Sequence, residues 1–173
     1  MRRMISALVL GLLATSPAFA QSFEPGLYLS ADAGRASISS KYADNSGDAT
    51  LSAAVGYQYT PNFGFEVYTR GLSLTPLRGA FAPAGYYPDT HYGIAALGTA
   101  RLDRNFRLYG RVGIGRTSMK GNRNSLPDRD ETDPIFGVGV GYAFNRNWSL
   151  NLEANYLTKS DVSLVTVGVR YQF

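Results

Sequence analysis

The most regular hydrophobic pattern of the chain lies in its last twelve residues, 162–173. Apolar and polar positions alternate there, and a period of two indicates a β-strand. One face carries Val165, Val167, Val169, Tyr171 and Phe173. An apolar strand at a sheet edge favours aggregation unless it pairs on both sides. We therefore expect this segment to close a sheet into a barrel whose outer face meets hydrocarbon.

Three short polar turns repeat along the chain. Asn62, Asn105 and Asn147 end these turns at spacings of 43 and 42 residues, and an aromatic residue follows each of them. Such a spacing fits two strands of about ten residues, one tight turn and one longer loop. Longer polar stretches, at 39–47, 76–88 and 119–131, and the short segment 159–161 alternate with the three turns. Short turns at one end and long loops at the other are typical of outer-membrane barrels.

This alternation of short turns and long loops predicts an all-β fold, an eight-stranded antiparallel up-and-down transmembrane β-barrel. The even strand number is at the small end of the known range for membrane barrels. We expect the tight turns and both chain ends on the periplasmic side and the long loops outside. The predicted strands cover 26–38, 48–60, 63–75, 90–102, 106–118, 134–145, 148–158 and 162–173.

The two faces of these strands differ in composition. One face is apolar and carries no charge in the strand centres, as in Leu29, Val55, Val67, Ile94 and Val112. The other face combines glycines with charged and polar side chains. A soluble eight-stranded barrel of the lipocalin type needs the opposite arrangement, with its apolar face inside. The composition therefore favours a membrane barrel with a polar interior.

The N-terminus predicts export. A basic start, an apolar run from Ile5 to Leu13 and the small-x-small pattern Ala18-Phe19-Ala20 are typical of a secretory signal peptide. We expect residues 1–20 to be cleaved, leaving 21–173 as the outer-membrane β-barrel domain. Removing Arg2 and Arg3 leaves 15 of the 17 basic residues against 13 acidic ones, so the charge gives no indication of nucleic-acid binding. The absence of cysteine excludes disulfides and thiolate metal sites.

Four segments resemble the small outer-membrane barrels similar to the OmpA transmembrane domain and OmpX: 26–34, 108–115, 136–144 and 169–173. The resemblance implies a monomer in the outer membrane of a Gram-negative bacterium, surrounded by outer-membrane lipid and lipopolysaccharide. It also implies delivery by periplasmic chaperones and insertion by the barrel-assembly machinery, which recognises a last strand ending in an aromatic residue. Tyr171 and Phe173 are the corresponding assembly signal here. We expect no appended peptidoglycan-binding domain, and therefore no tethering to the cell wall.

Candidate catalytic chemistry is sparse. His91 is the only histidine, and the segment 89–93 has no serine two residues after it, where similar lipid A deacylases carry one. We interpret His91 as a surface group at the barrel rim. Asp128, Asp130, Glu131 and Asp133 alternate with arginines and lack the spacing of a calcium loop, so we interpret them as a solvated face. We therefore expect no catalytic residue, metal or cofactor.

The interior of an eight-stranded barrel is just wide enough to be filled by side chains. Counted from the tight turns, five charged residues fall at similar depths and are expected to pair in one lumen layer. They are Asp32, Glu66, Arg111, Glu153 and Arg170. Glycines at 137, 139 and 141 leave room for long side chains. We interpret the chain as a structural or surface-interaction protein with a closed lumen; a narrow porin-like channel and a lipid A-modifying enzyme remain as alternatives.

Overall fold

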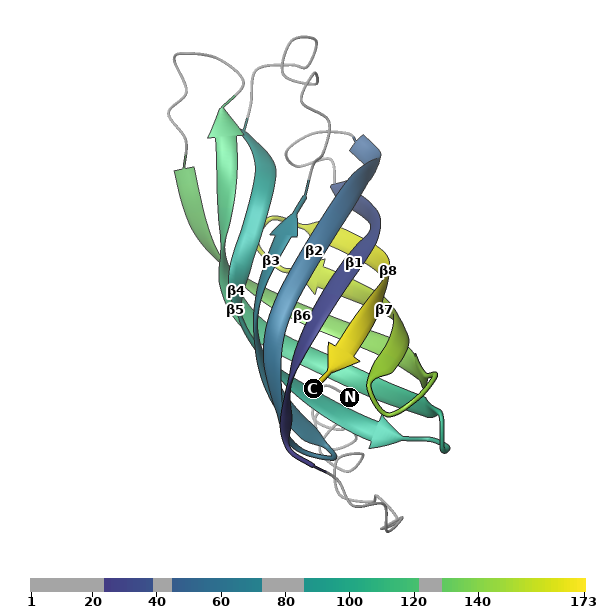
Figure 1. The fold of residues 1–173 in the computed structure, drawn as a ribbon. Coiled ribbons are helices and arrows are strands. Elements are labelled where there is room, and N and C mark those ends of the chain that lie inside the picture. The colour runs from purple at the N-terminus through teal and green to yellow at the C-terminus, as the bar shows by residue number, and fades with distance from the viewer. Residues whose placement is uncertain (1–23, 39–44, 73–85, 122–128) are drawn as a thin grey trace, which may run out of the picture.

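The computed structural model describes residues 24–38, 45–72, 86–121 and 129–173. In this part of the chain, eight antiparallel strands form one closed barrel in which each strand pairs with the next and the last pairs with the first (Figure 1). The strands are β1 Gly26–Ile38, β2 Asn45–Thr60, β3 Phe63–Gly71, β4 Tyr86–Arg101, β5 Phe106–Gly121, β6 Arg129–Ala143, β7 Trp148–Leu157 and β8 Val162–Gln172. The predicted fold class is confirmed.

The tight-turn ends of the strands lie close to their predicted positions, as do the long-loop ends of β1, β7 and β8, whereas those of β2, β4, β5 and β6 do not. β2, β4 and β6 begin three to five residues earlier than predicted, and β5 extends to Gly121. Predicting 86–88, 119–121 and 129–131 as loop was therefore wrong. These segments pair with each other, as in Tyr86 with Gly121 and Met119 with Arg129, which satisfies backbone groups despite the polar sequence. Pro88 is tolerated at a register shift, where its missing N–H breaks no regular ladder.

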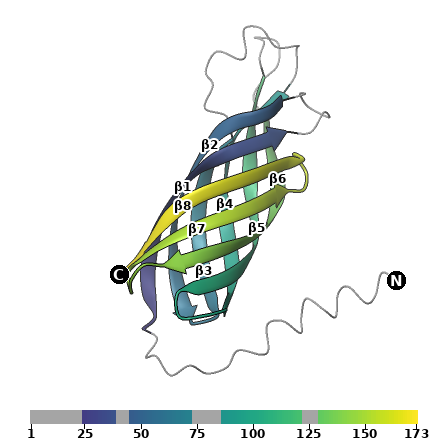
Figure 2. The ribbon, with the colours of Figure 1, turned by 90° about the vertical axis from the view of Figure 1, so that its right-hand side faces the viewer.

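The last strand closes the barrel as its alternation predicts. β8 pairs with β1 from Tyr28–Gln172 to Ile38–Val162, and Phe173 donates its N–H to Leu27 at 3.0 Å. The C-terminus therefore lies at the tight-turn end, where β1 also begins (Figure 2). The predicted signal peptide, residues 1–20, lies outside the described residues.

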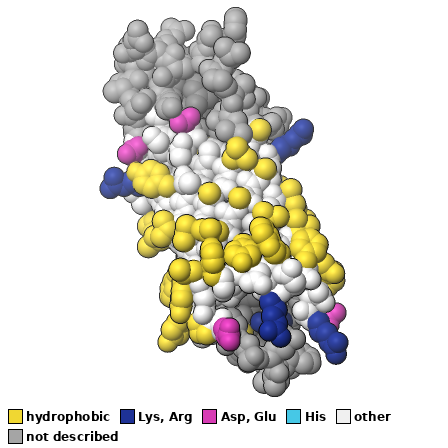
Figure 3. Space-filling model, viewed as in Figure 1, with side chains coloured by type: hydrophobic (Ala, Val, Ile, Leu, Met, Phe, Trp, Pro, Cys, Tyr) yellow, Lys and Arg dark blue, Asp and Glu magenta, His cyan; other side chains and the backbone are white. Residues whose placement is uncertain are grey.

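The outer wall of the barrel is apolar. Large hydrophobic side chains point outward from every strand, each at least 37% exposed, and they form a band between charged ends (Figure 3). One example from each strand, in chain order, is Leu29, Val55, Val67, Ile94, Val112, Val138, Leu152 and Val167. Apolar surface of this extent marks a membrane or protein contact. The described residues contain no helix suited to crossing a membrane.

Aromatic rings gather at the tight-turn end of this wall. Phe106 and Tyr142 lie 5.0 Å apart between ring centroids, and Trp148 and Tyr171 lie 4.9 Å apart. These rings belong to neighbouring strands that meet at the short turns. Aromatic side chains of this kind favour the membrane–water interface, where an apolar ring and a polar edge can both be accommodated. The tight-turn end therefore carries one aromatic girdle.

Candidate functional site in the barrel lumen

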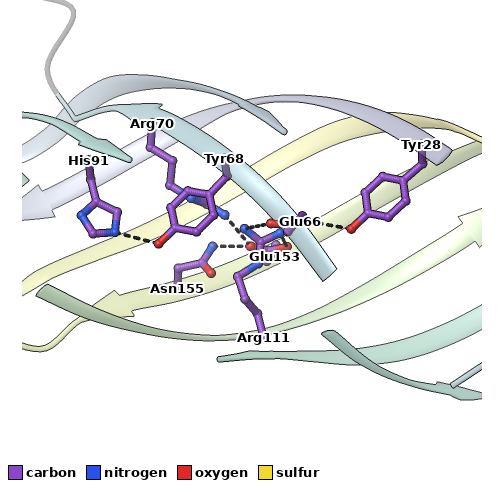
Figure 4. A network of polar contacts seen from close by, with 8 residues as sticks. All are labelled: Tyr28, Glu66, Tyr68, Arg70, His91, Arg111, Glu153 and Asn155. Atoms are coloured by element: carbon purple, nitrogen blue, oxygen red, sulfur yellow. Dashed lines mark hydrogen bonds and ion pairs between the residues drawn. The ribbon is translucent and has the colours of Figure 1, made fainter. Parts of the chain in front are cut away.

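A network of charged side chains crosses the lumen, and Arg111 of β5 lies at its centre (Figure 4). Its Nη1 lies 2.8 Å from Glu66 Oε1 of β3, and its Nη2 lies 3.0 Å from Glu153 Oε2 of β7. All three side chains are at most 5% exposed. A guanidinium with two carboxylates is the arrangement in which buried charges compensate one another's desolvation. The network therefore joins strands from opposite parts of the barrel wall.

Three further residues extend this network. Arg70 donates to Glu153 Oε1 at 2.9 Å, and Asn155 donates to the same oxygen at 2.6 Å. The Tyr28 hydroxyl donates to Glu66 Oε2 at 2.9 Å. Glu153 thus accepts from two guanidiniums and one amide, so its loss would leave several buried donors without their acceptor.

The structure brings together three of the five residues of the predicted charge layer: Glu66, Arg111 and Glu153. Arg170 instead donates to Gln58 Oε1 at 2.8 Å, with its Cζ 3.5 Å from the Tyr28 ring centroid. Asp32 packs against Gly168 of the neighbouring strand.

Sequence reasoning missed Arg70 as a partner of Glu153. The available signal was that Arg70 lies in phase with Glu66 on β3, four residues further along the same face. Which carboxylate it meets depends on β7, which is distant in the sequence.

Two glycines make room for long side chains, as the sequence predicts. A Cβ at Gly139 would lie 2.5 Å from Tyr109, and one at Gly141 would lie 2.5 Å from Arg107. Tyr109 and Arg107 belong to β5, and the two glycines belong to the neighbouring strand β6. The two long side chains therefore lie over the β6 backbone at these glycines. Gly137 accommodates Asn155 rather than an arginine.

His91 lies inside the barrel, so its interpretation as a surface group at the rim was wrong. It is fully buried; its Nε2 lies 2.9 Å from the Tyr68 hydroxyl and its Nδ1 lies 3.0 Å from Thr117 Oγ1. The reason is the length of β4, which continues past His91 to Tyr86 and leaves the histidine on the inward face of a paired strand.

Asp133 also lies inside the barrel, in contrast to its predicted place on a solvated face. It accepts hydrogen bonds from the Lys159 N–H at 2.8 Å, from the Ser160 N–H at 3.0 Å and from the Ser160 hydroxyl. The Thr117 hydroxyl, which also contacts His91, donates to Asp133 at 3.3 Å. Asp133 is therefore linked to His91 through Thr117. Its hydrogen bonds fix the turn between β7 and β8. Of the other acids of that prediction, Asp130 is exposed, and Asp128 lies outside the described residues.

An apolar layer lies beyond the network around Arg111, toward the long-loop end of the lumen. Its side chains come from five strands or their ends and are at most 1% exposed: Ala36, Leu72, Ile135, Leu157, Val162 and Leu164. The prediction of a lumen closed by charged and polar groups omitted this layer. The available signal was the alternation itself, because Leu157 and Leu164 are in phase with inward-facing Glu153 and Thr166.

The residues of the predicted assembly signal lie at the end of β8. Phe173 is 68% exposed, and the Tyr171 and Phe173 ring centroids lie 5.0 Å apart. Within the described residues, no group of three or more His, Cys, Asp or Glu side chains is placed to hold a metal ion.

Comparison with known families agrees with this architecture. A family model described as the outer membrane protein beta-barrel domain matches residues 5–173. The chain belongs to this family. Its membership, together with the apolar outer wall, places the barrel in the outer membrane of a Gram-negative bacterium.

Outer membrane protein A sequences are among the relatives of this barrel. The protein from Serratia marcescens is 26% identical over 138 residues, which cover 70% of this chain and 38% of that protein. The protein from Salmonella typhi is 31% identical over 134 residues, covering 68% of this chain and 38% of that protein. The chain thus spans 38% of the length of these relatives.

Solved structures show the same fold. The N-terminal barrel domain of Pseudomonas aeruginosa OprF has a TM-score of 0.62 at 14% identity, covering 86% of this chain and 97% of that chain. Neisserial surface protein A has a TM-score of 0.56 at 21% identity, covering 87% of this chain and 100% of that chain.

Proposed function

We propose that this barrel is a non-catalytic outer-membrane protein with a closed lumen, serving envelope structure or surface contact. The observation that supports the proposal is the presence of two successive groups of buried side chains in the lumen. The Arg111 network occupies its middle, and the apolar layer around Ile135 and Leu157 lies beyond it toward the long loops. Ions crossing this path would have to displace both groups.

The environment of His91 supports a non-catalytic role. A nucleophile in an esterase or deacylase needs a hydrogen-bonded base, which a third group orients. His91 has Tyr68 and Thr117 as its partners, and Ser160 donates to Asp133 instead. The imidazole is also fully buried, away from the lipid-facing wall on which a lipid substrate would lie. The arrangement resembles a structural hydrogen-bond chain.

Export, assembly and partners belong to the same proposal. The signal peptide at 1–20 would direct the chain to the periplasm, where Tyr171 and Phe173 would be read by the barrel-assembly machinery. Lipid and lipopolysaccharide would cover the apolar wall of a monomer. Surface contact would fall to the polar segments between the strands at the long-loop end, since connecting segments often carry binding residues on a rigid scaffold.

Conductance separates the closed barrel from a channel. The mature chain is refolded into planar bilayers and the current is recorded. We expect no conductance above that of a protein-free bilayer. Regular conductance steps that disappear in heat-unfolded samples would favour the porin-like alternative.

Lipid analysis tests the enzyme alternative separately. We expect the lipid A mass spectrum of a deletion strain to equal that of its parent. A changed acyl composition that is restored by the intact gene, but not by a His91→Asn variant, would favour catalysis.

A further inference from the structure

Two arginines at the tight-turn end of the lumen lie outside the Arg111 network and bind neutral partners. Arg107 Nη2 donates to Ser149 Oγ at 2.7 Å and to Asn151 Oδ1 at 2.9 Å. Arg170 Nη2 donates to Gln58 Oε1 at 2.8 Å. None of these three contacts supplies a negative charge.

The strand register brings these two guanidiniums to the same part of the lumen wall. Ser149, which accepts from Arg107, is the cross-strand neighbour of Arg170 in the β7–β8 ladder. Arg101 is the cross-strand neighbour of Arg107 in the β4–β5 ladder. Arg170 and Arg101 both repel the charge of Arg107. Positive charge therefore accumulates at this end.

The nearby carboxylates already have partners. Glu66 attracts Arg170, but its two oxygens are held by Arg111 and Tyr28. Arg170 Nε is buried and has no hydrogen-bond partner among the described residues. A buried guanidinium without a paired anion is costly, and an anionic ligand would offset that cost.

We propose that Arg107 and Arg170 form a binding site for a phosphate group at the tight-turn end of the lumen. Guanidinium groups match the geometry of phosphate oxygens and donate two parallel hydrogen bonds to them. Arg107 is only part-buried, and the residues of the adjoining β4–β5 turn are exposed, so a ligand can reach it from the tight-turn end of the barrel. The phosphate comes either from free inorganic phosphate or from the headgroup of a phospholipid in the inner leaflet. The site goes beyond the closed-lumen proposal and does not depend on it.

The test is calorimetric titration of the refolded mature chain in a non-ionic detergent, with sodium phosphate at constant ionic strength. We expect saturable binding to the parent and affinities at least about tenfold weaker for Arg107→Gln and Arg170→Gln, since each removes hydrogen bonds to a charged ligand. Arg104→Gln is the matched control, because Arg104 is exposed in the β4–β5 turn at the same end of the barrel. It is expected to bind as the parent does.

A second ligand identifies the source of the phosphate. Dihexanoyl phosphatidylglycerol, titrated in the same way, binds more tightly than inorganic phosphate if the site takes a lipid headgroup, and more weakly if it takes the free ion. Folding of each variant is checked by heat-modifiable mobility, and a glutamine variant that fails to fold is replaced by the lysine variant of the same position, Arg107→Lys or Arg170→Lys, which keeps the charge but loses the paired donors and is likewise expected to bind more weakly. Absence of binding of both ligands to the parent, or equal weakening by Arg104→Gln, would overturn the site.

Discussion

Asn147 binds Gln172 through both its backbone and its side chain. The Gln172 N–H donates to the Asn147 carbonyl at 2.8 Å, and Asn147 Nδ2 donates to the Gln172 carbonyl at 2.8 Å. The turn before β7 is thereby fastened to the closing strand β8. Asn62 binds Thr99 and Asn105 binds Ala143 in the same two ways. The asparagine repeat in the sequence therefore marks three equivalent clamps between a tight turn and the second strand after it.

Replacing Asn147 by alanine removes the side-chain half of one clamp and keeps the backbone half. We expect the free energy of unfolding to fall by about 1 kcal/mol, the usual net contribution of one hydrogen bond. Urea unfolding in detergent, followed by tryptophan fluorescence, measures the change. Arg146→Ala, an exposed position in the same turn, is the control and is expected to have no such effect. Equal midpoints for Asn147→Ala and the parent would show that the side-chain clamp is dispensable.

Glu153→Leu removes the carboxylate that accepts from Arg70, Arg111 and Asn155. We expect a loss of about 3–5 kcal/mol in the free energy of unfolding, because buried guanidiniums lose their counter-charge. Lys159→Leu, at an exposed side chain, is expected to change it by about 0.5 kcal/mol or less. The urea midpoints of both variants provide the measurement. A parent-like midpoint for Glu153→Leu would mean that the network is hydrated rather than buried.

In the proposed closed barrel, the Arg111 network and the apolar layer lie in series along the lumen, so opening one of them is expected to leave the other in place. Arg111→Ala and Leu157→Ala alone should behave like the parent in planar bilayers, whereas the double variant should show small conductance steps. The control is the double variant Arg116→Ala and Leu152→Ala, whose side chains are exposed on the outer wall. Conductance by Arg111→Ala alone would show that the apolar layer does not seal.

Deletion of Phe173 tests the assembly signal. Its exposed ring extends the lipid-facing side of β8, and we expect the deleted chain to be degraded in the periplasm instead of inserted. Phe144→Ala, at another exposed aromatic residue of the tight-turn end, is expected to assemble normally. The measurement is the amount of heat-modifiable protein in outer-membrane fractions. Normal amounts after deletion would contradict this role.

Chain orientation predicts which arginines a protease reaches on intact cells. Arg123 lies between β5 and β6, in a segment expected outside, and Arg104 lies in a tight turn expected in the periplasm. Trypsin added to intact cells is expected to cut after Arg123 and to spare Arg104, while permeabilised cells expose both. Cleavage confined to Arg104 on intact cells would reverse the orientation.

Local patterns allowed most of the barrel to be predicted. Alternation with a period of two depends only on strand geometry, so it identified the eight strands, their outward faces and the closing role of 162–173. The tight turns were located because asparagine and a following aromatic residue mark them within a few positions. The long-loop ends of β2, β4, β5 and β6 were misplaced because polar residues such as Arg129 and Tyr86 remain in strands only when a neighbouring strand extends equally far.

The sequence by itself determined that charged side chains face the lumen of a membrane barrel, because the face of a residue follows from its position along one strand. Which of these charges meet was decided only by the tertiary structure. Arg70 and Glu153 are 83 residues apart, and the stagger between strands brings them into contact while leaving Arg170 with Gln58. His91 likewise became buried through the length of its paired strand. Such contacts depend on barrel closure, a property of all eight strands together.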